Sequence, residues 1–267
     1  MADVVADLKR LRLYGMAACY SDGLEQGQPA MTAGTALLTQ LVQAEATDRA
    51  TRSVRYQMHV ARFPVHRDLA GFDFAQAKVD RRQITGFATT AFTAQAENIV
   101  LIGGTGTGKT HLATALGVQA ISRHGKRVRF FSTIDLVNQL EQEKATGKPG
   151  RLAHQLMHLD LLILDELGYV PFSQAGGALL FHLLSKLYEH TSVVITTNLV
   201  FAEWANVFFD AKLTTALLDR LTHHCHIVET GNDSYRFRQS RGQAKARIKS
   251  REQSKEAAGK EVIDEPF

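Results

Sequence analysis

The sequence contains little cysteine, with only Cys19 and Cys225 among its 267 residues. Two thiols this far apart along the chain do not form the dense disulfide framework that is typical of small secreted proteins. We therefore expect both to be buried, reduced thiols in a cytoplasmic protein. A chain of this length can bury a sizeable core without a metal or disulfide staple, and it has room for one large domain and a smaller one.

Long apolar runs are also missing. No segment approaches the roughly 18 apolar residues of a membrane-spanning helix. The first residues include Asp3 and Asp7 and lack the apolar stretch of a secretory signal. We therefore expect no membrane partner. The formal net charge of +4 is mild, so a polyanionic partner is permitted but not required.

A glycine-rich run is the most informative feature that is present. Residues 103–110 match G-x-x-x-x-G-K-[ST], the pattern of a phosphate-binding loop. Residues 98–102 before it predict a buried strand, and residues 111–116 after it predict the start of a helix. Glycines let the backbone approach an anion closely, and successive N–H groups then point at the phosphates. The predicted binding residues are Gly103, Gly104, Thr105, Gly106, Thr107, Gly108, Lys109, Thr110 and His111.

Two members of this loop have predicted roles of their own. We expect Lys109 to pair with the β- and γ-phosphates of a nucleoside triphosphate and the Thr110 hydroxyl to hold Mg²⁺. Residues 161–164 predict a buried strand that ends in Asp165 and Glu166. Asp165 is then a second Mg²⁺ ligand, and Glu166 polarises a water for attack on the γ-phosphate. An adjacent acid of this kind favours a hydrolysing ATPase over a kinase or a small GTPase.

Asn198 and Arg220 are further candidates with two interpretations each. Asn198 follows the predicted strand 193–197, where it is either a turn residue or a sensor of the γ-phosphate. Arg220 lies in a predicted helix, where it forms a surface salt bridge, for example with Asp219, or projects into a neighbouring subunit as an arginine finger. The run His223 to His226 includes Cys225, but four consecutive residues do not readily converge on one zinc ion.

The alternation of apolar strands with helices predicts an α/β fold with a parallel sheet covered by helices. We expect a helical N-terminal domain over residues 1–70, a connector over 71–96, an ATPase domain over 97–240 and a basic, disordered tail over 241–267. In the connector, Phe72 and Phe74 either pack on the core or form a wall for the adenine base. In the first domain, Gly15 is expected to end a first helix, and Pro64 a longer one.

Basic residues gather in three places. Arg49, Arg52, Arg55 and Arg62 share one face of a predicted helix, a second group contains Lys144, Lys148 and Arg151, and the third runs from Arg238 to Lys255. Each group is either a solvated surface or a contact for DNA phosphates, and the helical group is also suited to an acidic partner.

The chain resembles the IstB-type helper ATPases of bacterial insertion sequences, relatives of the helicase loader DnaC and the initiator DnaA in the AAA+ class. The resemblance covers about residues 5–240. It rests on residues 11–16 (LRLYGM), 72–74 (FDF), 103–112 (GGTGTGKTHL), 161–169 (LLILDELGY), 217–221 (LLDRL) and 234–236 (SYR).

The resemblance implies an AAA+ P-loop ATPase that uses ATP and Mg²⁺ and self-assembles on double-stranded DNA through shared ATP sites. It also implies that such a protein helps an IstA-type transposase to engage target DNA, with hydrolysis controlling disassembly. Arg236 becomes a second sensor, or a structural residue if no helical lid is present. The resemblance also places the protein in the bacterial cytoplasm, on the nucleoid when active. Two rival functions are a DnaC-type helicase loader and a DNA scaffold that binds nucleotide without hydrolysing it.

Overall fold

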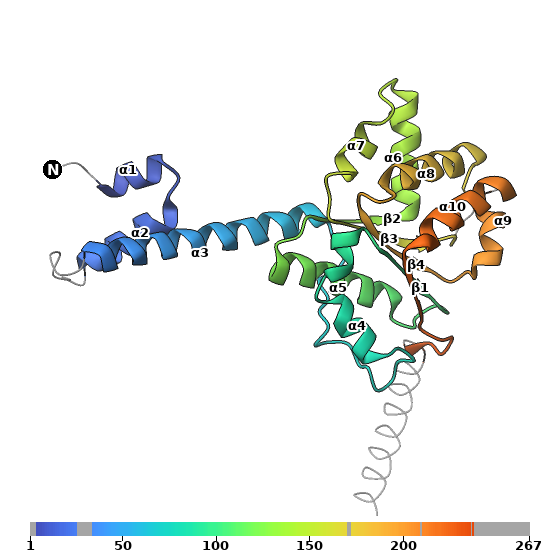
Figure 1. Cartoon of the computed structure of the whole chain (residues 1–267), viewed down its shortest axis with the longest axis horizontal. Coiled ribbons are helices and arrows are strands. Elements are labelled where there is room, and N and C mark those ends of the chain that lie inside the picture. The colour runs from blue at the N-terminus through green and yellow to red at the C-terminus, as the bar shows by residue number, and fades with distance from the viewer. Residues whose placement is uncertain (1–3, 26–33, 170–171, 209, 236, 238–267) are drawn as a thin grey trace, which may run out of the picture.

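The computed structural model describes residues 4–25, 34–169, 172–208, 210–235 and 237 (Figure 1). Arg236 and the basic tail after it, both singled out above, lie outside these residues. Within the described part of the chain, no helix is both long and apolar enough to cross a membrane.

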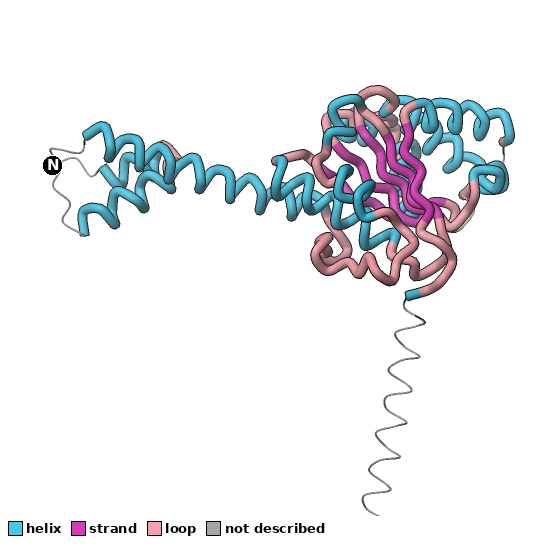
Figure 2. Tube along the Cα trace, turned by 60° about the horizontal axis from the view of Figure 1, so that its bottom comes forward, coloured by secondary structure: helices cyan, strands magenta, loops and turns pink. Residues whose placement is uncertain are grey.

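A parallel five-stranded sheet forms the centre of the larger body (Figure 2). The strands are β1 (Asn98–Ile102), β2 (Val128–Ser132), β3 (Leu161–Leu167), β4 (Ser192–Thr197) and β5 (Cys225–Glu229). Their spatial order is β2-β3-β4-β1-β5, and every pair is parallel. The strands are rich in buried apolar residues because helices cover both faces. The α/β prediction is therefore confirmed, although β5 was not predicted.

Two apolar cores lie on the two faces of the sheet. One contains Ile163 of β3 together with residues of α4 (Arg81–Phe87), η1 (Ala91–Gln95) and α5 (Lys109–His124). The other contains Leu164 of β3, because successive side chains of a strand point to opposite faces. Its helical elements are α6 (Thr133–Ala145), α7 (Arg151–Leu156), α8 (Gln174–Leu187), η2 (Phe201–Glu203), α9 (Trp204–Phe208) and α10 (Ala211–His223). The predicted connector thus contains α4 and η1, which its sequence pattern did not predict.

The N-terminal residues form α1 (Val4–Arg10), α2 (Tyr14–Glu25) and the long α3 (Gly34–Ala61). Helix α3 runs from the sheet out to α1 and α2 (Figures 1 and 2). Its last residue, Ala61, is fully buried in the core around α5. The expected end of this helix before Pro64 is confirmed.

The expectation that Gly15 ends a helix is wrong, because Gly15 lies in the first turn of α2. A Cβ atom at this position would lie 2.7 Å from the Cβ of Asp48 on α3. The missing side chain therefore permits close contact between two helices. The Gly15 amide donates a hydrogen bond of 2.9 Å to Oε2 of the buried Glu45, which fixes the same contact.

Candidate nucleotide-binding site

The glycine-rich loop connects β1 to α5, as the sequence predicts. Helix α5 begins at Lys109, directly after Gly108. Gly106 and Gly108 have φ values of 78° and 98°, a left-handed conformation that glycine adopts without steric cost. The Lys109 Nζ donates to the carbonyl oxygens of Gly103 and Gly104, both at 2.7 Å. The ammonium group is thus held against the loop, at a helix N-terminus that favours anions.

Thr110 and Asp165 meet at the carboxyl edge of the sheet. The Thr110 hydroxyl donates to Oδ1 of Asp165 at 3.0 Å, and the Thr196 hydroxyl donates to the same oxygen at 2.6 Å. Asp165 is only 7% exposed, and a buried carboxylate needs hydrogen-bond donors. Here one donor comes from β4 and one from α5. A hydroxyl and a carboxylate oxygen are the ligand types that Mg²⁺ prefers, so these two side chains are suited to hold the ion.

Glu166 has an unusual backbone conformation. Its φ of 61° is rare for a residue other than glycine, and such strain costs about 1–3 kcal/mol. Its amide leaves the regular ladder and donates to the Thr196 hydroxyl at 2.9 Å, where the register of β3 and β4 shifts. The side chain is therefore exposed, although Asp165 and Leu167 on either side are buried. An exposed carboxylate beside a candidate metal ligand can reach a water and polarise it, as a water-activating base does.

Asn198 follows β4 directly and is exposed. Strand β4 lies between β1, which leads into the glycine-rich loop, and β3, which ends near Asp165. The carboxyl ends of parallel strands meet at one edge of the sheet, where α/β proteins bind their ligands. Asn198 therefore lies on the same edge as both predicted parts of the site.

The connector aromatics pack on the outside of the loop. A Cβ atom at Gly108 would lie 2.7 Å from Cε2 of Phe72. The Phe72 ring also contacts those of Phe74 and His111, with centroid distances of 4.9 and 5.2 Å. His111 is held in turn by a 2.9 Å hydrogen bond between Nε2 and the Asp68 carbonyl oxygen. The connector thus braces the start of α5, and Phe72 lies beside the candidate phosphate site.

The segment after β5 supports the loop through residues that the sequence did not single out, whereas Arg236, the expected sensor in this segment, lies outside the described residues. The hydroxyls of Thr107 and Thr230 share a 2.6 Å hydrogen bond, and the Tyr235 amide donates to the Gly106 carbonyl at 3.0 Å. The Gly104 amide donates to the carbonyl oxygen of Gly231 at 2.8 Å. This segment supports the loop because β5 pairs with β1. The two strands are more than 120 residues apart, so no local sequence pattern predicts their contact.

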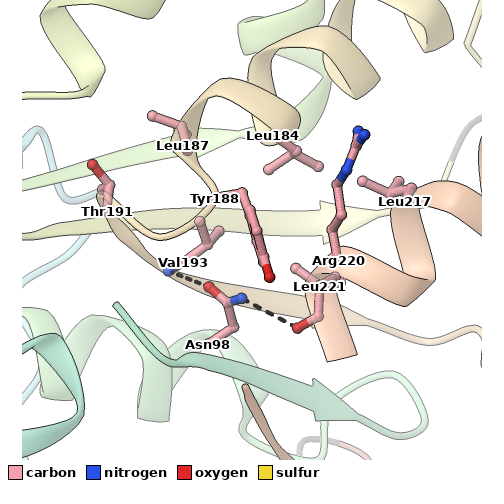
Figure 3. A pocket seen from close by; sticks show the side chains of 9 residues that line it. All are labelled: Asn98, Leu184, Leu187, Tyr188, Thr191, Val193, Leu217, Arg220 and Leu221. Atoms are coloured by element: carbon pink, nitrogen blue, oxygen red, sulfur yellow. Dashed lines mark hydrogen bonds between the residues drawn. The ribbon is translucent and has the colours of Figure 1, made fainter. Parts of the chain in front are cut away.

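Arg220 does not lie at the carboxyl edge of the sheet, where the phosphate loop of its own subunit is found. It lines a small, open pocket together with Asn98 and Val193, which lie at the starts of β1 and β4 (Figure 3). A five-residue strand spans about 17 Å, so this guanidinium lies at the far edge of the sheet. Its Nη1 donates to Ser185 Oγ at 2.6 Å, and the group lies over the Phe181 ring at 5.5 Å. Among the ion pairs of the described residues none involves Arg220, which disfavours the salt-bridge interpretation.

The basic groups differ in whether their side chains form ion pairs with nearby carboxylates. Arg49 pairs with Glu45 at 2.6 Å and Arg52 with Asp48 at 2.7 Å, so half of the helical group is neutralised within α3. Arg55 and Arg62 remain exposed on the same helix or just after it.

Lys144, Lys148 and Arg151 are all exposed around the turn between α6 and α7. The conformation of this turn is held by Glu143, which accepts hydrogen bonds from the amides of Gly150 and Leu152 at 3.2 and 2.8 Å. It therefore displays three cations on a defined loop.

Cys225 and His226 are neighbours on β5 and point to opposite faces of the sheet. His226 Nε2 lies 3.0 Å from Glu97 Oε2, whereas Cys225 packs against the core around α10. Burial raises the pKa of the Cys225 thiol to about 12. Among the described residues, no three His, Cys, Asp or Glu side chains are placed to hold a metal ion. Cys19 and Cys225 are both free thiols, as expected, but each is half-buried rather than buried.

Comparison with known proteins identifies the family. Residues 6–243 match the family described as IstB-like ATP binding protein. The putative ATP-binding protein of insertion sequence IS5376 from Geobacillus stearothermophilus is 35% identical over 233 residues, which cover 87% of this chain and 92% of that protein. The putative ATP-binding protein of insertion sequence IS21 from Pseudomonas aeruginosa is 36% identical over 235 residues, 88% of each chain.

Solved structures agree on the fold. The DnaC helicase loader superposes with a TM-score of 0.50 at 23% identity, covering 56% of this chain and 86% of that one. DnaI superposes with a TM-score of 0.51 at 18% identity, covering 65% of this chain and 93% of that one. These likenesses show that the α/β fold of this chain is shared with DnaC and DnaI. The extent of the family match, together with relatives above 30% identity over most of both chains, shows that this protein belongs to the IstB-like ATP-binding family.

Proposed function

We propose that this protein is a Mg²⁺-dependent ATPase that assembles on double-stranded DNA and regulates transposition with a partner transposase. The observation that carries the proposal is the contact between Thr110 and Asp165 beside the strained Glu166. It joins a phosphate loop, a candidate metal site and a candidate base at one edge of the sheet. The names of the relatives, which are ATP-binding proteins of insertion sequences, support the cellular role.

Each side chain has a definite task in this proposal. Lys109 binds the β- and γ-phosphates, and its charge stabilises the negative charge that develops during phosphoryl transfer. Thr110 and Asp165 hold Mg²⁺, which neutralises phosphate oxygens when bound. Glu166 accepts a proton from the attacking water, and Asn198 orients that water or the γ-phosphate. Phe72, whose ring lies beside Gly108, forms one wall for the adenine base, whereas Phe74 packs against the core.

Arg220 acts on the ATP of a neighbouring subunit. Its position at the opposite edge of the sheet removes it from its own site, and its exposure on α10 makes it available to a second copy. An arginine finger of this kind contributes about 10³–10⁵ to the rate. A site that needs two copies makes hydrolysis depend on assembly.

Mixing two inactive variants tests this arrangement. Arg220→Ala keeps an intact phosphate loop but supplies no finger, whereas Lys109→Ala has a defective loop and an intact finger. Each alone should lose most phosphate release. A mixture should regain activity, because the loop of the first variant meets the arginine of the second. Persistent inactivity of the mixture would contradict a shared site.

The turn between α6 and α7 is our candidate for the DNA contact. Its three cations are exposed, whereas Arg49 and Arg52 of the helical group are already paired. Phosphate contacts release counterions, so each lost contact should lower the salt dependence of binding by about one unit of slope. Lys148→Ala with Arg151→Ala should reduce this slope for duplex DNA, whereas the matched control Arg123→Ala with Lys212→Ala should not. An unchanged slope in the first variant excludes the turn.

The second candidate function is a helicase loader, because the fold matches DnaC and DnaI. The two functions predict different partners for the N-terminal helices. Pull-down with an IstA-type transposase, and separately with a replicative helicase, distinguishes them. Capture of the helicase alone would overturn the transposition role. Phosphate release with and without duplex DNA tests the third possibility, a scaffold that does not hydrolyse ATP.

A further inference from the structure

Asn98 is a polar residue at the start of the apolar strand β1, and the oxygen and the nitrogen of its side-chain amide each form a hydrogen bond. It is 7% exposed. Its Oδ1 accepts the Val193 amide of β4 at 3.0 Å, and its Nδ2 donates to the Leu221 carbonyl of α10 at 3.2 Å (Figure 3). A buried amide with both ends satisfied is held in one orientation, so Asn98 fixes α10 relative to the sheet.

The acceptor on α10 is one that the helix itself does not use. Leu221 lies in the last turn of a helix that ends at His223, and carbonyls in a last turn lack an intrahelical donor. The backbone amide of Asn98 also donates, at 2.7 Å, to the carbonyl of His224, the residue after the helix. One residue of β1 therefore supplies two donors to the C-terminal end of α10.

Arg220 directly precedes Leu221, so its backbone is fixed by the same contact. We propose that Asn98 is a positioning residue for Arg220. By holding the Leu221 carbonyl, Asn98 fixes the backbone beside Arg220 and so orients its guanidinium toward the neighbouring subunit. The proposal rests on the proposed shared ATP site. It makes β1 a link between two sites, because the strand begins at Asn98 and leads into Gly103 of the subunit's own phosphate loop.

Asn98→Ala tests the proposal, since it removes the donor to Leu221. Displacement of a reacting group by about 1 Å can cost about 100-fold in rate, so we expect kcat to fall by about 10- to 100-fold. KM and the affinity for a fluorescent ATP analogue should stay within about twofold of the wild type, because the phosphate loop is at the other end of the strand. Ser192→Ala is the matched control, since the buried Ser192 hydroxyl bonds to the Phe92 carbonyl at the same edge.

A second variant covers the case in which the alanine variant does not fold. Asn98→Asp keeps an oxygen that accepts the Val193 amide but, when ionised, has no donor for Leu221. It should show the same fall in kcat with unchanged nucleotide affinity. If both properties stay at wild-type values in Asn98→Asp, the side-chain donor does not position Arg220 and the proposal is wrong.

Mixed assemblies separate positioning from damage to the loop. A subunit carrying Asn98→Asp has a competent phosphate loop, so mixing it with Lys109→Ala should restore phosphate release. Mixing it with Arg220→Ala should not, because neither subunit then supplies a well-placed arginine. No restoration with Lys109→Ala would mean that the substitution damages its own site, which overturns the proposal.

The mixture of Arg220→Ala with Lys109→Ala is run beside these two. If that mixture also stays inactive, the shared site itself fails. If it recovers while the Asn98→Asp mixture does not, the shared site stands and only the role of Asn98 fails.

Discussion

The hydroxyl of Thr110 donates to Oδ1 of Asp165 at 3.0 Å, although 55 residues separate the two along the chain. Thr110 is the second residue of α5, which follows β1, and Asp165 lies on β3, with β4 between the two strands. The parallel order brings both residues to one edge of the sheet, where Thr196 of the intervening strand bonds to the same oxygen. This contact holds two candidate Mg²⁺ ligands together.

Replacement of Thr110 should separate metal binding from folding. Thr110→Ala removes the hydroxyl, so we expect ATP binding in the presence of Mg²⁺ to weaken at least tenfold while binding without Mg²⁺ changes little. Thr110→Ser retains the hydroxyl and should behave like the wild type. Titration of a fluorescent ATP analogue with and without Mg²⁺ measures the difference. Equal weakening with and without the ion would assign Thr110 to the nucleotide rather than the metal.

Replacement of Glu166 should stop turnover and leave binding intact. Glu166→Gln keeps the shape of the side chain but removes the base, which should lower kcat by about 10²–10⁴-fold. ATP affinity should remain, and assemblies on DNA should last longer because hydrolysis no longer ends them. Glu189→Gln is a suitable control, since Glu189 is also exposed and also has a positive φ, of 60°. Phosphate release at the wild-type rate in Glu166→Gln would remove Glu166 from the mechanism.

Two glycines with positive φ should respond differently to alanine. Gly125 follows α5 with open space around it. Gly125→Ala should therefore lower the free energy of unfolding only by the steric cost of a left-handed alanine, about 1–2 kcal/mol. Gly108→Ala adds a Cβ atom 2.7 Å from Phe72 and forces either the loop or the ring to move. We expect it to lose ATP binding as well as stability. Thermal denaturation and nucleotide titration of both variants compare the two effects, and equal ATP affinity in the two variants would contradict this account.

The contact of Glu45 with α2 should make the N-terminal helices sensitive to acid. Burial raises the pKa of Glu45, but hydrogen bonds from Arg49 and from the amides of Met16 and Gly15 outweigh it and bring the pKa below 4.5. The folded state therefore binds this proton less readily than the unfolded state. Its stabilisation is complete above pH 4.5 and is lost as the pH falls through the lowered pKa.

The Tm difference between the wild type and Glu45→Gln measures this effect. It should be largest near neutral pH and should shrink once the pH falls below 4.5. A difference that is the same at pH 7 and pH 3 would show that the charge of Glu45 does not stabilise the fold.

The sequence by itself determined the phosphate loop and the buried strand that leads into Asp165. Both are local patterns, in which glycine spacing, an apolar run and the residue directly after it report on neighbours along the chain. The α/β class followed from the same alternation. The amphipathic pattern of α3 likewise predicted a long helix that ends before Pro64. Local patterns failed at Gly15, where the reason for the glycine is a contact with a helix 30 residues away.

Only the tertiary structure decided how these parts combine. It placed Thr230 and Tyr235 against the loop through the pairing of β5 with β1, and it placed Arg220 at the edge of the sheet opposite its own loop. It also gave Glu166 the positive φ that exposes its carboxylate. Strand order, register and backbone strain depend on contacts between residues far apart in the sequence. The sequence therefore determined which candidate groups are present, and the packing of the sheet decided which of them meet at one edge of the sheet and which lie at the other.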